Sequence, residues 1–353
     1  MKIAMFCPNW VGDLVMATPA LRAVRNRYPR AEIIGIMRPY LSDVLDGTGL
    51  IDRELFYDPR GANPAQRGWS LSRQLRHEEI DLALLFTNSF RTALIAWAGR
   101  IDRRVGFARD ARRWLLTDTL KPKSRRTPLP VIDEYWRLAA YVGGKVAGGT
   151  AERRKMELAS SSDDELQFQR ILARIGSPEE TRGLVCLNSG GAFGAAKHWP
   201  TSSFAELGRL IADKFHKQVV VLCGPAEQAQ AREIVRLAGH PHVISLAGES
   251  PSLRLTKAAI SQADLLVTTD SGPRHFAAPF NVPVVTIFGP THIPWSETFY
   301  PKAVHLQLHV DCGPCQKRVC PLGHHRCMQE LGVDRVFSAV TKILHESARR
   351  SVA

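Results

Sequence analysis

Asp13 is the first residue of the sequence that can do chemistry, because it lies at the junction of two segments with different periodicity. Apolar residues 2–7 predict a short buried strand, and the pattern over residues 13–27 predicts a helix. Gly12 allows a ligand to approach the backbone closely at this junction. The Asp13 carboxylate can take a proton from a substrate hydroxyl. In the alternative interpretation it only stabilises the first helical turn, by about 0.5–1 kcal/mol.

A glycine-rich loop, "NSGGAFGAAKHWP" over residues 188–200, follows another apolar run. It contains Gly190, Gly191 and, further on, Lys197. Backbone amides of such a loop, together with a lysine, suit the oxygens of a phosphate. The spacing matches neither the P-loop nor the G-x-G-x-x-G pattern, so an ordinary turn between a strand and a helix remains the alternative.

A second acidic junction, "TTDSGPRHFAA" over residues 268–278, places Asp270, Ser271, Gly272 and His275 after an apolar run. A helix that begins here would present unpaired N–H groups and a partial positive charge to a diphosphate. Asp270 and Ser271 can equally be capping residues of that helix. His275 can equally be a structural histidine of the core.

The elements that must position these residues alternate between strand and helix in both halves of the chain. This alternation predicts an α/β protein with two Rossmann-like, doubly wound parallel sheets. A stretch rich in Gly, Ser and charge over residues 143–182 separates the halves. We therefore predict a first domain over 1–155, a second over 156–335 and a C-terminal helix over 336–353. Ligands bind at the carboxyl ends of the strands in such sheets, where all three motifs are expected.

The composition favours anionic partners. Lysine and arginine outnumber aspartate and glutamate by 47 to 34, which gives a formal net charge of +13. Basic residues concentrate in 100–126, but no zinc-finger spacing or RNA-binding signature accompanies them, so we expect no nucleic-acid partner. No apolar run reaches the roughly 18 residues of a membrane helix. Polar residues interrupt the N-terminal apolar run, which argues against a signal peptide and for a cytoplasmic protein.

Four of the seven cysteines are clustered in "CGPCQKRVCPLGHHRC". Their spacing is compatible with a structural zinc or iron–sulfur site. The alternatives are reduced cysteines in a packed loop or redox-linked cysteines, since stable disulfides are disfavoured in a reducing compartment. The candidate metal ligands are Cys312, Cys315, Cys320 and Cys327.

Taken in order, "NWVGD", "TNSFRTALIAWAGRIDRRVGF", "GAAKHWP" and "TDSGPRH…FGPT" resemble the lipopolysaccharide heptosyltransferases of glycosyltransferase family nine. The resemblance implies a GT-B fold, in which two Rossmann-like domains face a central cleft. It implies an inverting transfer of L-glycero-D-manno-heptose from ADP-heptose to the inner-core heptose of lipopolysaccharide, the heptosyltransferase II reaction. It also implies that catalysis needs no metal or other cofactor.

The resemblance also assigns roles to individual residues. Asp13 matches the catalytic base, and Lys197 matches a lysine near the donor phosphates and is a second catalytic candidate. The implied donor-binding residues are Gly190, Gly191, Lys197, Glu227, Asp270, Ser271, Gly272 and His275. The candidate acceptor-binding residues are Asn9, Trp10, Asn88, Ser89, Arg112 and Arg113. The pair Pro273-Arg274 departs from the apolar pair expected between the glycine and the histidine.

The implied partners are ADP-heptose and Kdo2-lipid A that carries one heptose. Because this acceptor is anionic and lies in a membrane, we expect peripheral contact with the cytoplasmic face of the inner membrane through the basic first domain. Other GT-B enzymes, such as a heptosyltransferase I or a nucleotide-sugar epimerase, remain alternatives. A non-catalytic nucleotide- or metal-binding module is a third possibility, and it requires that Asp13→Asn leave function intact.

Overall fold

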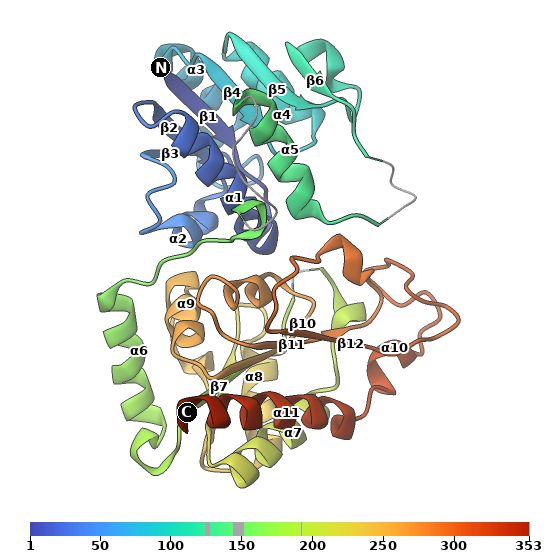
Figure 1. The fold of residues 1–353 in the computed structure, drawn as a ribbon. Coiled ribbons are helices and arrows are strands. Elements are labelled where there is room, and N and C mark those ends of the chain that lie inside the picture. Colours follow the sequence, from blue (N-terminus) through green and yellow to red (C-terminus); the bar gives the residue numbers. More distant parts are fainter. Residues whose placement is uncertain (124–127, 144–151, 192, 353) are drawn as a thin grey trace. The chain divides into compact units, whose positions relative to one another are not determined.

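The computed structural model describes residues 1–123, 128–143, 152–191 and 193–352 (Figure 1). The chain forms two compact units, one of Met1–Ala159 with Pro294–Thr298, the other of Ser160–Ile293 with Phe299–Ala353. The domain boundary predicted after residue 155 lies shortly before the start of the second unit. The C-terminal helix, predicted over 336–353, belongs to the second unit.

The first unit contains one parallel sheet with the strand order β3-β2-β1-β4-β5-β6. Its strands are β1 (Lys2–Phe6), β2 (Glu32–Met37), β3 (Arg53–Phe56), β4 (Leu82–Leu85), β5 (Arg103–Phe107) and β6 (Asp118–Leu120). Its helices are α1 (Val11–Arg27), α2 (Ser42–Leu45), α3 (Gly68–Glu78), α4 (Phe90–Ala98) and α5 (Val131–Gly143). The central strands β1 and β4 are apolar and buried, as helices on both faces of a sheet require.

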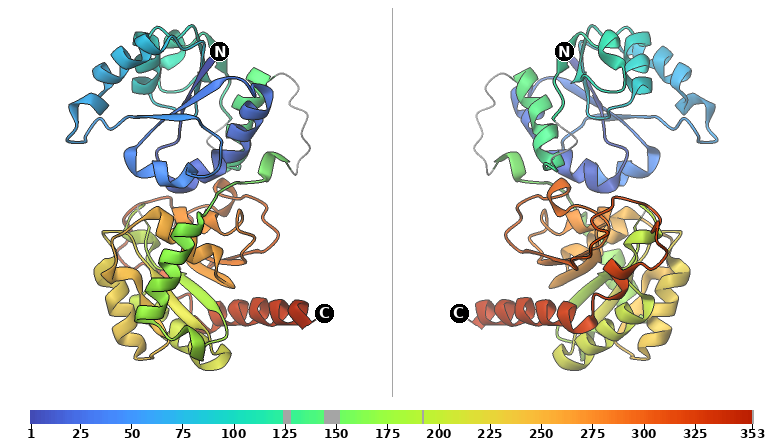
Figure 2. Two further views of the ribbon diagram at one scale, coloured as in Figure 1. Left: turned by 90° about the vertical axis from the view of Figure 1, so that its left-hand side faces the viewer. Right: turned by 90° about the vertical axis from the view of Figure 1, so that its right-hand side faces the viewer.

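The second unit repeats this plan, with the strand order β12-β11-β10-β7-β8-β9. Its strands are β7 (Leu184–Asn188), β8 (Gln218–Leu222), β9 (Val243–Ser245), β10 (Leu265–Thr269), β11 (Val284–Phe288) and β12 (Ala303–Gln307). Its helices are α6 (Ser162–Ile175), α7 (Thr201–Phe215), α8 (Gln228–Ala238), α9 (Leu253–Ser261), α10 (Arg326–Gln329) and α11 (Val333–Val352). Figure 2 shows that helices cover the sheet of each unit.

Both sheets therefore have the Rossmann strand order. The second and third strands of each unit lie on one side of its first strand, and the fourth to sixth strands lie on the other side. The carboxyl ends of β1 and β4 are neighbours in the first unit, and those of β7 and β10 are neighbours in the second. These topological switch points carry the three motifs singled out in the sequence. The predicted α/β class with two doubly wound sheets is confirmed.

Candidate functional site

Asp13 lies in the first turn of α1, just beyond the carboxyl end of β1. The hydroxyl of Tyr135, on α5, donates a hydrogen bond to Asp13 Oδ1 at 2.9 Å. Burial and the charge of Asp13 hold the pKa of Tyr135 well above its ordinary value, so this phenol remains a donor at neutral pH. The contact leaves an oriented carboxylate at the switch point of the first sheet.

Tyr135→Phe is expected to lower kcat by about tenfold, because a hydrogen bond to a charged group is worth about 1.5–3 kcal/mol. The acidic limb of the pH–rate profile should also move to higher pH, since the charged carboxylate loses a donor. Tyr28→Phe is the matched control. The Tyr28 hydroxyl donates to the Val142 carbonyl, so it also joins the end of α1 to α5 but does not touch Asp13. Equal effects of the two variants on kcat and the pH profile would refute this role of Tyr135.

The other predicted acceptor residues follow β1 and β4. Asn9 and Trp10 are exposed and immediately precede α1. Asn88 is exposed after β4, and Ser89 caps α4 by accepting a hydrogen bond from the N–H of Thr92 at 3.2 Å. Because β1 and β4 are adjacent and parallel, these residues share one sheet edge with Asp13.

Arg112 is not the surface residue that the basic segment led us to expect. Its side chain is fully buried, and its guanidinium donates to the carbonyls of Phe107 and Thr87 and to Asn88 Oδ1. Burial lowers the pKa of Arg112 to about 10, which still leaves it charged at neutral pH. Arg112 therefore fixes Asn88 and the ends of two strands, whereas Arg113 is exposed.

Arg112→Met is expected to destabilise the protein by about 3 kcal/mol, because it leaves buried carbonyls without a donor. Equilibrium unfolding in urea measures this change in the free energy of unfolding. Arg113→Met is the matched control and should change it by less than about 0.5 kcal/mol, as is usual for exposed positions. A small effect of Arg112→Met on the free energy of unfolding would mean that the buried guanidinium does not stabilise the fold.

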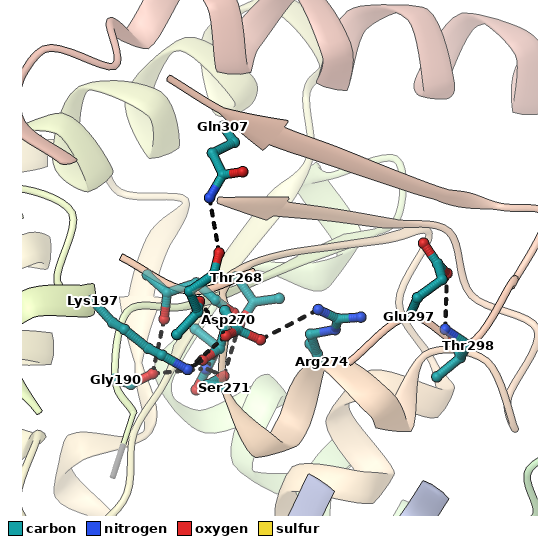
Figure 3. A network of polar contacts seen from close by, with 12 residues as sticks. Gly190, Lys197, Thr268, Asp270, Ser271, Arg274, Glu297, Thr298 and Gln307 are labelled. Carbon is teal, nitrogen blue, oxygen red and sulfur yellow. Dashed lines mark hydrogen bonds and ion pairs between the residues drawn. The ribbon is translucent and has the colours of Figure 1, made fainter. Parts of the chain in front are cut away.

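The second unit gathers the remaining predicted site residues around Asp270, directly after β10 (Figure 3). Lys197 Nζ donates to Asp270 Oδ2 at 2.6 Å and to the Asp270 carbonyl at 2.9 Å. Thr291 Oγ1 donates to the same carboxylate oxygen at 2.7 Å, and Arg274 lies 3.3 Å from the other. Burial disfavours the charged carboxylate, but Lys197 and Arg274 outweigh it and hold the pKa of Asp270 at about 2.

The segment after Asp270 differs from the predicted helix. Gly272–Phe276 forms a short 3-10 helix, and its second residue, Pro273, has no N–H to donate. It therefore aligns fewer peptide dipoles and offers fewer free N–H groups toward a diphosphate than the expected helix. His275 is buried, and burial together with Arg274 lowers its pKa well below the ordinary value. His275 is thus neutral at physiological pH and supplies no positive charge.

The glycine-rich loop packs directly against Glu227 and the end of β10. A Cβ atom added to Gly190 would lie 2.6 Å from Glu227 Cγ, and one added to Gly191 would touch Ser271. Thr269 Oγ1 donates to the Gly190 carbonyl at 3.1 Å. The structure thus brings together the predicted donor residues of this unit, and Gly190 is required for their close approach.

Gly190→Ala is expected to weaken ADP binding by about tenfold or more, because the added methyl group must displace Glu227 or the loop. Calorimetric titration with ADP measures the loss. Gly248→Ala is the control, since a Cβ there meets no atom within 4 Å. Unchanged ADP affinity in Gly190→Ala would exclude this loop from the nucleotide site.

Sequence reasoning missed several residues that complete these two groups. Tyr135 is 122 positions from Asp13 and belongs to an amphipathic helix that looks like ordinary packing. Asn188 donates to Thr268 and Ser271, and Thr291 donates to Asp270. Asn188 is the last residue of β7, and Thr291 follows the end of β11 by three residues. Their places near the ends of apolar strands were the signal that could have identified them.

The cysteine-rich segment contacts the loop that carries Lys197. The carbonyl of Arg318 accepts a hydrogen bond from Ala196 N at 3.1 Å, and a Cβ at Gly194 would lie 2.5 Å from that carbonyl. The guanidinium of Arg318 and the ammonium of Lys197 both lie over the ring of Phe193, at 5.5 and 4.4 Å. The segment therefore helps to place Lys197.

The cysteine arrangement does not support the predicted metal site. All four cysteines have free thiols. Among the residues that the structure describes, no group of three or more His, Cys, Asp or Glu side chains is arranged to hold a metal ion. The spacing in the sequence is thus not matched by converging ligands. The residues concerned are Cys312, Cys315, Cys320 and Cys327.

Two Rossmann-type units in tandem, each with polar residues at its switch point, are the architecture of GT-B enzymes. The model of glycosyltransferase family 9 (heptosyltransferase) matches residues 68–326, and the chain belongs to this family. It is thus an enzyme, a glycosyltransferase.

Similar proteins cover nearly the whole chain. It is 28% identical to lipooligosaccharide heptosyltransferase 2 of Campylobacter jejuni, over 97% of this chain and 99% of that protein. It is also 28% identical to lipopolysaccharide heptosyltransferase 2 of Escherichia coli, over 98% and 99%. The solved structure of E. coli ADP-heptose LPS heptosyltransferase II superimposes with a TM-score of 0.80, at 25% identity, over 99% of this chain and 100% of that one.

In the described part of the chain, no helix is both long enough and apolar enough to cross a membrane.

Proposed function

We propose that the protein transfers L-glycero-D-manno-heptose from ADP-heptose to the inner-core heptose of lipopolysaccharide, as a heptosyltransferase II. The observation that carries the proposal is the similarity to enzymes of that name over nearly the whole length of the chain. The acceptor is then Kdo2-lipid A with one heptose. We place the reaction at the cytoplasmic face of the inner membrane, with the enzyme bound peripherally.

In this proposal Asp13 is the catalytic base of the first domain. An acceptor hydroxyl is a poor nucleophile, and a carboxylate that removes its proton in the transition state contributes about 10²–10⁴-fold. Tyr135 orients the carboxylate by its hydrogen bond. Attack by the hydroxyl on the face opposite the departing ADP inverts the anomeric centre, as in other inverting sugar chemistry.

The second domain holds the donor. In the proposal the glycine loop and Glu227 bind the nucleotide, and Lys197 stabilises the diphosphate, on which negative charge grows as ADP leaves. Asp270 holds the Lys197 ammonium in place. With this fixed charge, the proposed reaction uses no metal ion or other cofactor.

Mass spectrometry of three incubations tests this function. The enzyme is given ADP-heptose alone, ADP-heptose with Kdo2-lipid A, or ADP-heptose with Kdo2-lipid A that carries one heptose. The proposal expects a gain of one heptose only in the third. A gain in the second would indicate a heptosyltransferase I. An isomerised donor in the first, which has an unchanged mass and is detected by NMR, would indicate an epimerase. No change in any of them would favour a non-catalytic binding module.

A further inference from the structure

The outer face of α4 carries an apolar ridge that is largely exposed in the part of the first unit that the structure describes. Phe90, Leu94 and Trp97 are spaced four and three residues apart, so they lie on one face of the helix. Phe90 is 45% exposed and Trp97 is 53% exposed. Trp69, at the start of α3, is 72% exposed. Large aromatic side chains exposed on two neighbouring helices mark an interaction surface.

A hollow of about 540 Å³ lies beside this ridge, between α3, α4 and the loop that follows β3. Trp69 and Leu94 line it together with Tyr57, Pro59 and Pro64. The loop after β3 and the first turns of both helices stand at the carboxyl ends of the strands. The hollow thus begins at the same edge of the first sheet as Asp13 and extends along α4 to Ala98, the last residue of that helix.

The hollow carries positive charge. Arg67 and Arg91 line it and are exposed, and in the part of the chain that the structure describes neither forms an ion pair with a carboxylate. Arg60 and Arg73 are exposed close by in the sequence. Guanidinium groups bind phosphate in a bidentate manner, and tryptophan beside arginine is the composition that proteins use at a membrane–water interface.

We propose that this α3–α4 surface, formed by Arg67, Trp69, Arg91, Leu94 and Trp97, binds the acylated, phosphorylated end of the acceptor lipid at an anionic membrane. The inference rests on the proposed function, which makes the acceptor a lipid. The arginines engage the headgroup phosphates, and the aromatic ridge enters the interfacial layer. A second copy of the chain fits less well, because it would bring the same arginines against each other.

Vesicle co-sedimentation of the full-length protein tests the surface. Wild type should bind vesicles of phosphatidylcholine mixed with phosphatidylglycerol and not vesicles of phosphatidylcholine alone. The double variant Arg67→Ala/Arg91→Ala should weaken this binding by about 30-fold, and Trp69→Ala by about tenfold. Arg170→Ala and Leu237→Ala change exposed residues of the second unit and serve as matched controls for charge and apolar area. Thermal unfolding checks that each variant is folded.

A second readout separates this inference from the proposed function. The variants Arg67→Ala/Arg91→Ala and Trp69→Ala should raise KM for the lipid acceptor in vesicles. They should not raise KM for a water-soluble, deacylated acceptor. If transfer occurs but vesicle binding is the same in all variants, the α3–α4 surface does not bind lipid, and the proposed function stands. If vesicle binding falls as expected but no transfer occurs, the function is wrong and the surface stands as a lipid site. Self-association of wild type that Trp69→Ala abolishes, without vesicle binding, would overturn the inference in favour of a dimer interface.

Discussion

Asp13→Asn is expected to lower kcat by about 10²–10⁴-fold, because the amide cannot take the proton of the acceptor hydroxyl. The dissociation constant of ADP should stay unchanged, since the predicted donor residues belong to the second unit. Steady-state kinetics and calorimetric titration measure the two quantities. The amide keeps the shape of the side chain and can still contact Tyr135, so the fold should persist.

Asp163→Asn is the matched control for the alternative interpretation of Asp13. Asp163 is also an acidic residue in the first turn of a helix, α6, but it is exposed. If Asp13 only stabilised its helix, both variants would lose about 0.5–1 kcal/mol of stability and neither would lose activity. That result would remove the catalytic base from the proposed mechanism.

Lys197→Met is the second variant with a large expected effect, because it leaves Asp270 without its closest cation. Breaking a buried ion pair costs about 3 kcal/mol of unfolding free energy, and loss of the lysine should also weaken ADP binding by about tenfold or more. Lys217→Met is the matched control. Lys217 pairs with Asp264 at 2.8 Å, but that carboxylate is about half exposed, so its loss should cost about 1 kcal/mol or less.

The stability of Lys197→Met should also depend differently on pH. In wild type the pKa of Asp270, about 2, is below the unfolded value of 3.8, so the charged carboxylate contributes stability above about pH 4, and this is lost as pH falls through about 2. Without Lys197 the pKa of Asp270 rises toward or above the unfolded value, so this loss of stability in acid becomes smaller or reverses. Urea unfolding at neutral and acidic pH measures this. A stable variant with unchanged pH dependence and full ADP affinity would contradict the role given to Lys197.

The fold was predictable from the sequence because parallel sheets leave a strong pattern. Continuous apolar runs such as residues 82–85 are typical of strands buried on both faces. Glycine and acidic residues directly after such runs mark the carboxyl edge, so Asp13 and Asp270 could be chosen as site residues from one sequence. The prediction of the fold and the choice of these two site residues both depend on the local sequence pattern and on the sheet topology that this pattern implies.

What the sequence could not provide depends on tertiary contacts. Arg112 looked like a surface residue of a basic segment, yet strand ends from two parts of the chain enclose it. The contact of Tyr135 with Asp13 joins positions 122 residues apart. The 3-10 conformation of Gly272–Phe276 overrides a pattern that favoured a longer helix. Charge and hydrophobicity along the chain carry no information about such long-range partners.

A single-turnover measurement tests the central claim most directly. Enzyme saturated with ADP-heptose is mixed rapidly with the lipid acceptor that carries one heptose, and released ADP and heptosylated lipid are quantified after acid quench. We predict that each ADP released matches one heptose gained by the lipid, and that Asp13→Asn slows this step by about 10²–10⁴-fold. Release of ADP without heptose on the lipid, or a rate for Asp13→Asn within about threefold of wild type, would contradict the account.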